Sequence, residues 1–307
     1  MRLNQWYFVF IVLLTASSCN VVEKEPVKND LSTRNASSVA KPILTKDSIS
    51  IDLDTSLSQE YGFDTSTVTL NEIVDEFSFV DHRETRSGIV IDWIEKTKGR
   101  SLKRGELLML EYRLSLPDGK IIDGNNRMKM PYLPFVLGFN IQNKGWDEAL
   151  SLMHIGELAQ IKIPANLAYG KKGLGDLIPP NTENWLFVKI HGVVSPSKQE
   201  NGVKTWELRS GTEHEIEKVS KVKFHMIAST ESKANIFNTY TSNFPVTYTP
   251  GQRNYPIGLR SVLNNAKIGQ QIFVVLDPNM AYGIDGYMDL VKPNESVFYN
   301  LKILEIE

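Results

Sequence analysis

The sequence is poor in the residues on which many catalytic and binding sites depend. It has a single cysteine, Cys19, so no disulfide can form within the chain. The five histidines are far apart, and neither an HExxH motif nor a second cysteine accompanies them. Positive and negative charges nearly balance at a formal net charge of −2, which leaves no basic excess to attract phosphates. We therefore expect neither a metal nor a nucleic-acid partner.

Motifs for nucleophilic and nucleotide chemistry are also missing. There is no GxSxG turn and no Walker-type glycine loop. The GLG at residues 173–175 is not placed between a strand and a helix, as a dinucleotide-binding fingerprint requires. The sequence therefore predicts no cofactor.

The N-terminus lacks an apolar run of the ~20 residues that a membrane-spanning helix needs. Instead, Arg2, an apolar run at residues 6–14 and small residues at 15–18 precede Cys19, which is the layout of a secretory signal peptide. This segment resembles the lipobox of bacterial lipoproteins, although Ala16 stands where leucine is usual. The resemblance implies a signal over residues 1–19 with Cys19 as the acylated N-terminus. Ordinary signal cleavage beside an incidental cysteine is the alternative.

Residues 20 to about 70 are rich in Ser, Thr, Asn, Asp and Lys and have no sustained apolar period. We predict that residues 20–87 form a disordered, flexible tether. Ile73, Val74 and Phe77 fall at helical spacing, which favours a short amphipathic helix over residues 70–86.

The remainder of the chain predicts many strands and few helices. Alternating stretches at residues 107–116, 159–165 and 184–194 indicate strands. Residues 145–156 indicate one short helix that ends at Gly156. Many strands around one helix suggest the α+β class.

The second half of the chain repeats the first at a fixed offset of 113 positions. Paired motifs include Gly145 with Gly258, Ile155-Gly156 with Ile268-Gly269, and Ala168-Tyr169-Gly170 with Ala281-Tyr282-Gly283. A single register held over this length indicates an internal duplication. We therefore predict two tandem domains, residues 88–195 and 203–307, joined by the polar linker 196–202.

The first domain resembles the FK506-binding protein (FKBP) family throughout its length. The resemblance is carried by GRSLKRGELLMLEYRLSLPDGKIID, FVLG, GWDEAL, IPANLAYGKKG, IPPN and WLFVKI, which agree with the family in order, spacing and residue type. It implies two tandem FKBP-like domains, each a half-wrapped antiparallel β-sheet around one short helix. It also implies a shallow apolar pocket and peptidyl-prolyl cis-trans isomerase activity in the first domain.

Prolyl isomerisation does not require the nucleophile, metal or nucleotide motifs that the sequence lacks. Rotation about an X-Pro bond must overcome a barrier of ~18–20 kcal/mol, because amide resonance is lost, but no bond is broken. A catalyst therefore needs an apolar site that removes water from the imide and binds its twisted form better than either planar form.

The resemblance assigns five catalytic residues. Trp146 matches the indole floor of the pocket, and Tyr112 and Asp123 match its wall and its buried carboxylate. Tyr169 matches the tyrosine whose hydroxyl donates to a substrate carbonyl, and Ile178 matches an apolar lip. The alternatives are structural: a core tryptophan, a turn-capping Asp123, and loop-packing roles for Tyr169 and Ile178.

The pocket departs from the family at several positions. Ile122 replaces a common phenylalanine, Leu133 and Leu186 replace aromatic residues, Asn143 replaces an apolar side chain, and Leu174 replaces a histidine. We expect proline binding, weaker catalysis and poor macrolide affinity. The predicted substrate-binding residues are Ile122, Leu133, Phe135, Asn143, Leu174 and Leu186.

The second domain lacks the main catalytic groups. The repeat places Leu259 at the position of Trp146 and places Asn238 or Ile236 at the position of Asp123. We therefore predict a degenerate FKBP-like module that binds or packs but does not catalyse.

The sequence thus predicts a lipid-anchored isomerase of the cell envelope that faces the periplasm or the cell surface. Its expected partners are proline-containing polypeptide clients, particularly newly exported chains, and the membrane through the N-terminal lipid. The anchor and first domain resemble lipoproteins of Bacteroidota, some of them associated with gliding motility. A chaperone or assembly lipoprotein that holds extended chains without catalysis is the alternative.

Overall fold

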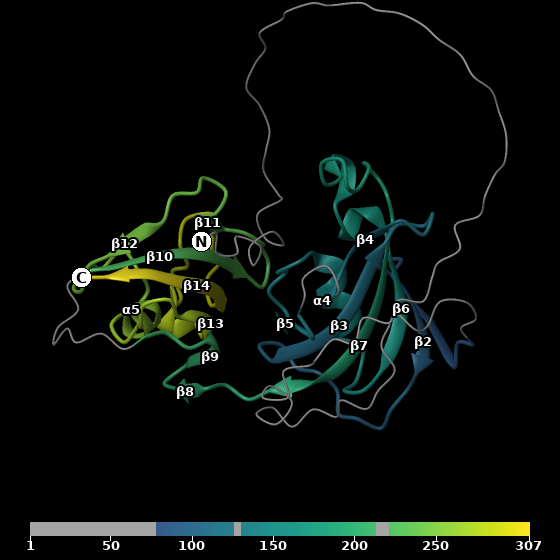
Figure 1. Cartoon of the computed structure of the whole chain (residues 1–307), viewed down its shortest axis with the longest axis horizontal. Helices are drawn as coiled ribbons and strands as arrows, with labels where there is room; N and C mark the ends of the chain where they lie inside the picture. Colours follow the sequence, from purple (N-terminus) through teal and green to yellow (C-terminus); the bar gives the residue numbers. More distant parts are fainter. Residues whose placement is uncertain (1–77, 126–129, 213–220) are drawn as a thin grey trace, which may run out of the picture.

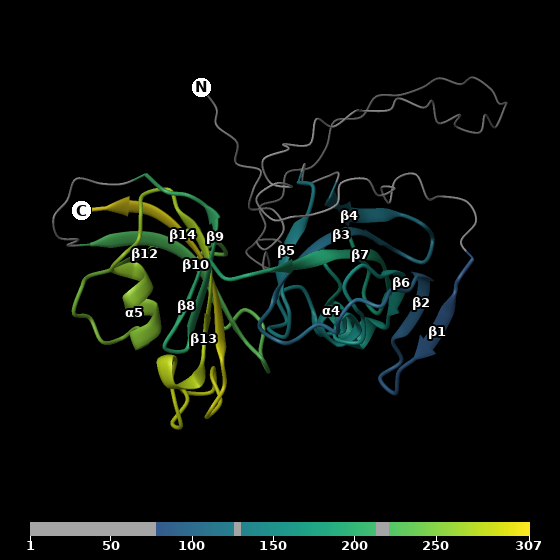
Figure 2. The same cartoon turned by 90° about the horizontal axis from the view of Figure 1, so that it is seen from below.

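A computed structural model describes residues 78–125, 130–212 and 221–307 (Figure 1). The predicted signal peptide, Cys19 and residues 20–77 of the predicted tether lie outside the described residues. The described part forms two antiparallel sheets of seven strands each, and each sheet has one short α-helix beside it (Figure 2). The α+β class and the two tandem domains are therefore confirmed.

The first sheet has the order β1-β2-β6-β7-β3-β4, and β5 pairs with β3. Its strands are β1 (Asp81–Glu84), β2 (Val90–Glu95), β3 (Leu107–Ser115), β4 (Ile121–Gly124), β5 (Leu133–Val136), β6 (Leu158–Ile163) and β7 (Asn184–Val194). The helix α4 (Lys144–Leu150) packs on β6, and two 3₁₀ turns, η2 (Ala165–Leu167) and η3 (Gly170–Lys172), follow that strand.

The second sheet repeats this topology with the order β11-β10-β14-β13-β9-β8, and β12 pairs with β10. Its elements are β8 (Lys198–Glu200), β9 (Val203–Arg209), β10 (Val222–Thr230), β11 (Phe237–Asn238), β12 (Val246–Tyr248), α5 (Ile257–Leu263), β13 (Gln271–Leu276), η4 (Pro278–Met280) and β14 (Val297–Ile306). The duplication read from the sequence is therefore also a duplication of topology.

Two predicted boundaries need correction at the edges of the sheets. Residues 81–84, assigned to the tether and its helix, form β1 and pair with β2, so the first domain begins before residue 88. Part of the predicted linker forms β8, which pairs with β9 of the second domain. Every residue of β1 and β8 is exposed, so neither strand has the apolar alternation that would have indicated it.

The predicted helix over residues 145–156 is shorter than expected. It ends at Leu150, with Ser151 as its C-cap, and Met153 closes a turn by donating to the carbonyl of Leu150. Leu150 and Met153 are both fully buried, so the apolar pattern continues through this turn although the helix does not.

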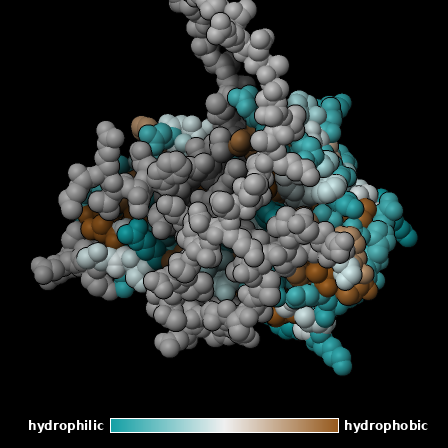
Figure 3. All heavy atoms as spheres, turned by 45° about the vertical axis from the view of Figure 1, so that its right-hand side comes forward, coloured by the Kyte–Doolittle hydropathy of each residue, from teal (hydrophilic) through white to brown (hydrophobic). Residues whose placement is uncertain are grey.

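Each domain has its own apolar core between sheet and helix, and some strands bury both of their faces. Successive strand residues point to opposite faces. On β13, Val274 and Leu276 face the second core, whereas Phe273 and Val275 face a separate cluster shared with the first domain. In the view of Figure 3, hydrophobic residues on the described surface form separate patches among hydrophilic ones.

Candidate functional site

The start of α4 fixes the position of Trp146. Asn143 has an extended backbone, with φ −159° and ψ 167°, and its Oδ1 accepts a hydrogen bond from the backbone N–H of Trp146 at 3.2 Å. This is a standard N-cap, which satisfies one of the free donors of the first helical turn. Gly145 permits the close approach of α4 to β6, because a Cβ there would lie 2.2 Å from Cγ2 of Ile163.

Two aromatic side chains enclose the indole of Trp146. The ring of Tyr112 meets it edge-on at a centroid distance of 5.3 Å, and the ring of Phe135 lies at 5.9 Å and 34°. Both are favourable arrangements for aromatic pairs. Trp146 is only 1% exposed, so the indole is more deeply covered than an open pocket floor would be.

Tyr112 and Asp123 form a buried hydrogen-bonded pair. They lie on neighbouring strands, β3 and β4, and the hydroxyl of Tyr112 donates to Oδ2 of Asp123 at 2.7 Å. Burial raises the pKa of Tyr112 far above its usual value, and the charge of Asp123 acts in the same direction. The hydroxyl therefore remains a proton donor at any physiological pH.

Tyr169 lies between η2 and η3, where it packs against the first core. Burial raises the pKa of its hydroxyl to about 12; Asp123 acts in the same direction and the amide of Asn143 acts against it. Tyr169 therefore stays protonated and able to donate. Asp123 and the Asn143 side chain are the two polar groups that influence this pKa.

The loop after η3 carries the predicted apolar lip. Ile178 is fully buried, and its carbonyl accepts from the N–H of Leu174 at 2.8 Å. Gly173 has φ +64°, and a Cβ there would lie 2.2 Å from the carbonyl oxygen of Ile178. Glycine is therefore required to close this loop over the site.

The structure joins some of the predicted site residues by direct contacts to Trp146 or Tyr112 and places the others in the core of the first domain. Asp123 and Asn143 join the site through their hydrogen bonds to Tyr112 and Trp146. The others belong to the first core or pack against it: Tyr112, Ile122, Leu133, Phe135, Trp146, Tyr169, Leu174, Ile178 and Leu186.

The sequence interpretation missed two supporting residues. Asn125 accepts from the backbone N–H of Tyr112 at 2.5 Å through Oδ1, and its Nδ2 donates to the carbonyls of Leu110 and Pro131, both at 3.3 Å. The carboxylate of Asp147 accepts from backbone N–H groups in the loop before α4. Both side chains bind backbone groups, which residue type alone does not indicate. Thr239 of the second domain has the same role as Asn125, because its hydroxyl accepts from the backbone N–H of Met226 at 2.9 Å.

Two polar atoms of the site have no hydrogen-bond partner in the described part of the chain. They are Nδ2 of Asn143 and Nε1 of Trp146, both on buried residues. The N-cap bond orients the amide of Asn143, because Oδ1 must face the Trp146 N–H. Both nitrogens are buried, so neither can reach a bound carbonyl unless the side chains that cover them move.

The second domain presents different groups at the equivalent positions. Met226 pairs with Leu301 in the second sheet, and Tyr112 pairs with Val188 in the first. Leu301 is the counterpart of Val188 at the repeat offset of 113, so Met226 stands at the position of Tyr112. The expectation of Asn238 or Ile236 for the carboxylate position is wrong.

The pairing of Ala228 with Phe237 repeats that of Leu114 with Asp123, so Phe237 stands at the carboxylate position. The offset is 114 along both strands of this hairpin, because Tyr112 corresponds to Met226 and Asp123 to Phe237, whereas the neighbouring strands β7 and β14 keep the offset of 113. Leu259 occupies the position of Trp146, as the repeat predicts, and is fully buried. This site thus lacks the indole, the phenol and the carboxylate.

The part of the chain that the structure describes has neither a metal-binding cluster nor a membrane-spanning helix. Among residues 78–125, 130–212 and 221–307, no three His, Cys, Asp or Glu side chains are grouped so as to hold a metal ion. Within these ranges, no helix combines the length and the apolar character needed to cross a membrane.

Comparisons with known proteins identify the family of this chain. The family model for the FKBP-type peptidyl-prolyl cis-trans isomerase matches residues 98–191 and 212–304. The human peptidyl-prolyl cis-trans isomerase FKBP10 is 27% identical over 206 residues, which cover 67% of this chain and 35% of that protein. FK506-binding protein 4 of Aspergillus fumigatus is 39% identical over 103 residues, which cover 34% of this chain and 20% of that protein.

Among solved structures, FkpA from Escherichia coli is 29% identical with a TM-score of 0.34, and the match covers 36% of this chain and 51% of that one. The chain spans about a third of the length of the FKBP10 relatives that it matches. Because the family model covers both repeats and more than half of the chain, the chain belongs to the FKBP-type peptidyl-prolyl cis-trans isomerase family.

Proposed function

We propose that the first domain catalyses the cis-trans isomerisation of X-Pro bonds in exported polypeptides. The observation that carries this proposal is the arrangement of Trp146, the Tyr112–Asp123 pair and Tyr169 in one buried, mainly apolar site. An apolar surround favours the twisted imide because it removes the water that stabilises the planar, resonant amide. No bond is made or broken, so the site needs no nucleophile.

Each polar group has a part in this proposal. The hydroxyl of Tyr169 donates to the carbonyl of the residue that precedes proline. In the twisted imide this carbonyl is no longer conjugated with the prolyl nitrogen. The Tyr112 hydroxyl holds the carboxylate of Asp123 in place at the wall of the site. The prolyl ring packs on Trp146, which requires covering side chains to move because the indole is 1% exposed.

The covered indole supports a second candidate, in which the protein holds extended chains without accelerating isomerisation. The loss of the indole, phenol and carboxylate from the second domain favours the same alternative. The two functions differ in whether the rate of isomerisation changes, because holding a chain does not lower the barrier of ~18–20 kcal/mol.

The test uses the full chain in a protease-coupled prolyl isomerisation assay. We expect a rate above the uncatalysed background that falls at least tenfold in Trp146→Leu, since leucine is the residue that the second domain has at this position. Asp123→Asn keeps the size of the side chain and is expected to lower the rate several-fold. Suppression of aggregation with no change in isomerisation rate would establish the holding function instead.

We also propose that Cys19 anchors the protein to a membrane of the cell envelope by a lipid, and that proline-containing clients meet it on the periplasmic or outer side. The support is the order of charged, apolar and small residues before Cys19. In a bacterial host that processes lipoproteins, the wild type should incorporate labelled palmitate and Cys19→Ala should not. Labelling of both proteins, or of neither, would refute the anchor.

A further inference from the structure

The two domains share an apolar cluster that belongs to neither core. Phe139 is 1% exposed, and its ring lies 5.9 Å from that of Phe298, which in turn meets Phe273 edge-on at 5.1 Å. Trp206 adds a hydrogen bond from Nε1 to the carbonyl of Val194 at 3.0 Å. This interdomain cluster comprises Leu107, Val136 and Phe139 of the first domain and Trp206, Phe273, Val275 and Phe298 of the second.

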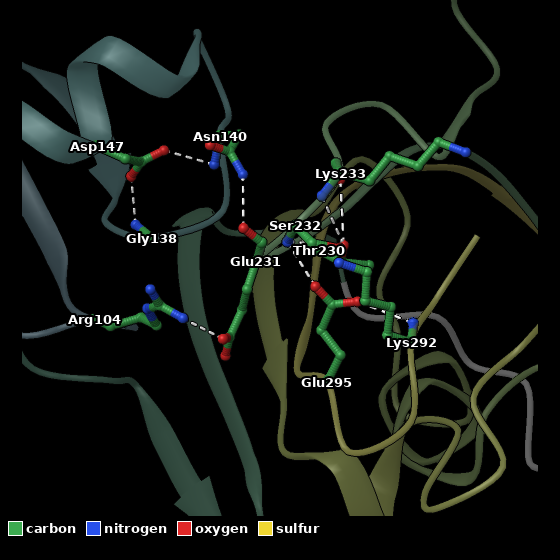
Figure 4. Close-up of polar contacts among 10 residues, drawn as sticks. All are labelled: Arg104, Gly138, Asn140, Asp147, Thr230, Glu231, Ser232, Lys233, Lys292 and Glu295. Atoms are coloured by element: carbon green, nitrogen blue, oxygen red, sulfur yellow. Dashed lines mark hydrogen bonds and ion pairs between the residues drawn. The ribbon is translucent and has the colours of Figure 1, made fainter. Parts of the chain in front are cut away.

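Polar contacts join the same surfaces (Figure 4). Nδ2 of Asn140 donates to the backbone carbonyl of Glu231 at 2.9 Å, and the carboxylate of Glu231 forms an ion pair with Arg104. Arg104 packs closely against Gly138, where a Cβ would lie 2.4 Å from its Cγ. Glu231 therefore contacts the first domain through both its backbone and its side chain.

The segment that carries Glu231 is held firmly within the second domain. The N–H of Ser232 donates to Oε1 of Glu295 at 2.6 Å, and the N–H of Lys292 donates to Oε2 of the same carboxylate at 3.0 Å. The N–H of Lys233 donates to the hydroxyl of Thr230 at 3.0 Å. Glu231 is thus presented from a preorganised turn (Figure 4).

On the other side of this contact, residues 138–143 lead directly into α4 and the catalytic site. The carboxylate of Asp147 accepts from the backbone N–H groups of Gly138 and Asn140, the latter at 2.6 Å. Asp147 follows Trp146 in the chain. Ile141 packs against both the first core and the interdomain cluster. The loop ends at Asn143, which caps α4.

We infer that the second domain acts as a positioning element for the first, because it holds residues 138–143 and, through them, Asn143 and Trp146. Glu231 and Phe298 are then positioning residues for a site that lies in the other domain. This inference rests on the proposed isomerase function for its kinetic consequence, but its structural consequence, the order of the 138–143 loop, is independent of that function.

The test uses the full chain with two substitutions that preserve local geometry. Asn140 has φ +51°, which Asp tolerates nearly as well, so Asn140→Asp removes the donor to Glu231 without straining the loop. Glu231→Gln removes the ion pair with Arg104. The control is Glu305→Gln, which removes an ion pair with Lys223 within the second domain; the side chain of Glu305 is 62% exposed and that of Glu231 is 28% exposed.

Two measurements are made on each variant. Hydrogen exchange at the backbone amide of Gly138, which donates to Asp147, should accelerate in the double variant Asn140→Asp/Glu231→Gln, whereas amides of β3 and β7 should not change. The value of kcat/KM should fall roughly two- to thirtyfold, the range expected when a coupling between sites is broken. The control should change neither quantity.

The outcomes separate this inference from the proposed function. Faster exchange in a protein that never accelerates isomerisation would refute the function and keep the positioning role. Unchanged exchange at Gly138 would overturn the inference whatever the activity. Faster exchange with unchanged kcat/KM in an active enzyme would also overturn it, because the loop would then move without affecting the site.

Discussion

Removing one hydroxyl from the buried site gives a quantitative test of how that site is built. In Tyr112→Phe the aromatic ring remains, so the edge-on contact with Trp146 at 5.3 Å is preserved. The substitution removes the hydroxyl that donates to Oδ2 of Asp123 at 2.7 Å. Tyr112 is 2% exposed and Asp123 is 8% exposed. The substitution therefore removes this buried hydrogen bond and keeps the aromatic ring.

The magnitude follows from the burial of this pair. A hydrogen bond to a charged group contributes about 1.5–3 kcal/mol, and the Asp123 carboxylate remains buried when this donor is removed. We expect the free energy of unfolding to fall by about 2 kcal/mol. Burial keeps the pKa of Tyr112 far above neutrality, so the loss should be the same between pH 6 and pH 9.

The assay is urea unfolding of the full chain, followed by fluorescence and by circular dichroism. Tyr287→Phe is a matched control, because that ring is 39% exposed and stacks on Tyr282, and we expect a change below about 0.5 kcal/mol. A loss below 0.5 kcal/mol in Tyr112→Phe, or an equal loss in the control, would refute the assignment of Tyr112 and Asp123 as a stabilising buried pair.

Three further predictions concern the support of the site. Burial raises the pKa of Asp147 from 3.8 to about 6, so its contribution to stability is complete below pH 3.8 and is lost as pH rises through 6. Unfolding at pH 5 and pH 7 should show about 1 kcal/mol more stability at pH 5, a difference absent from Asp147→Asn. Gly145→Ala should destabilise the chain by about 1–3 kcal/mol in urea, because its Cβ would collide with Ile163; no loss would contradict the close packing of α4. Asn125→Ala should lower stability by about 1–3 kcal/mol, since it leaves the Tyr112 N–H unpaired, and an unchanged unfolding midpoint would contradict this.

Much of the fold follows from apolar periodicity and from the internal repeat. The predicted strand at residues 184–194 coincides with β7, because this strand is the centre of the first sheet and is buried along most of its length. Strands β1 and β8 were not predicted, since edge strands with four and three exposed residues have no apolar pattern. Their pairing is determined by backbone hydrogen bonds, which residue type does not reveal.

The site was predictable where residue identity carries the chemistry and not where register or the backbone does. Trp146 and Tyr112 were found through the family resemblance, and the structure places them in contact. Phe237 was missed because a fixed repeat offset of 113 cannot follow β10 and β11, which are shifted by one residue to an offset of 114. The interdomain cluster was missed for another reason: Phe273 and Phe298 lie in strands with continuous apolar runs, which appear to be ordinary core until both faces are assigned.

The most direct test of the central claim, catalysis in the first domain alone, compares the same substitution at the two equivalent sites of the full chain. Tyr169→Phe and Tyr282→Phe each remove one hydroxyl at positions related by the repeat. The measurement is kcat/KM for prolyl isomerisation of a peptide substrate. We predict that the wild type accelerates the reaction, that Tyr169→Phe lowers kcat/KM by roughly three- to tenfold, as expected for one hydrogen bond, and that Tyr282→Phe leaves it unchanged. Equal losses at the two positions, or no acceleration by the wild type, would contradict it.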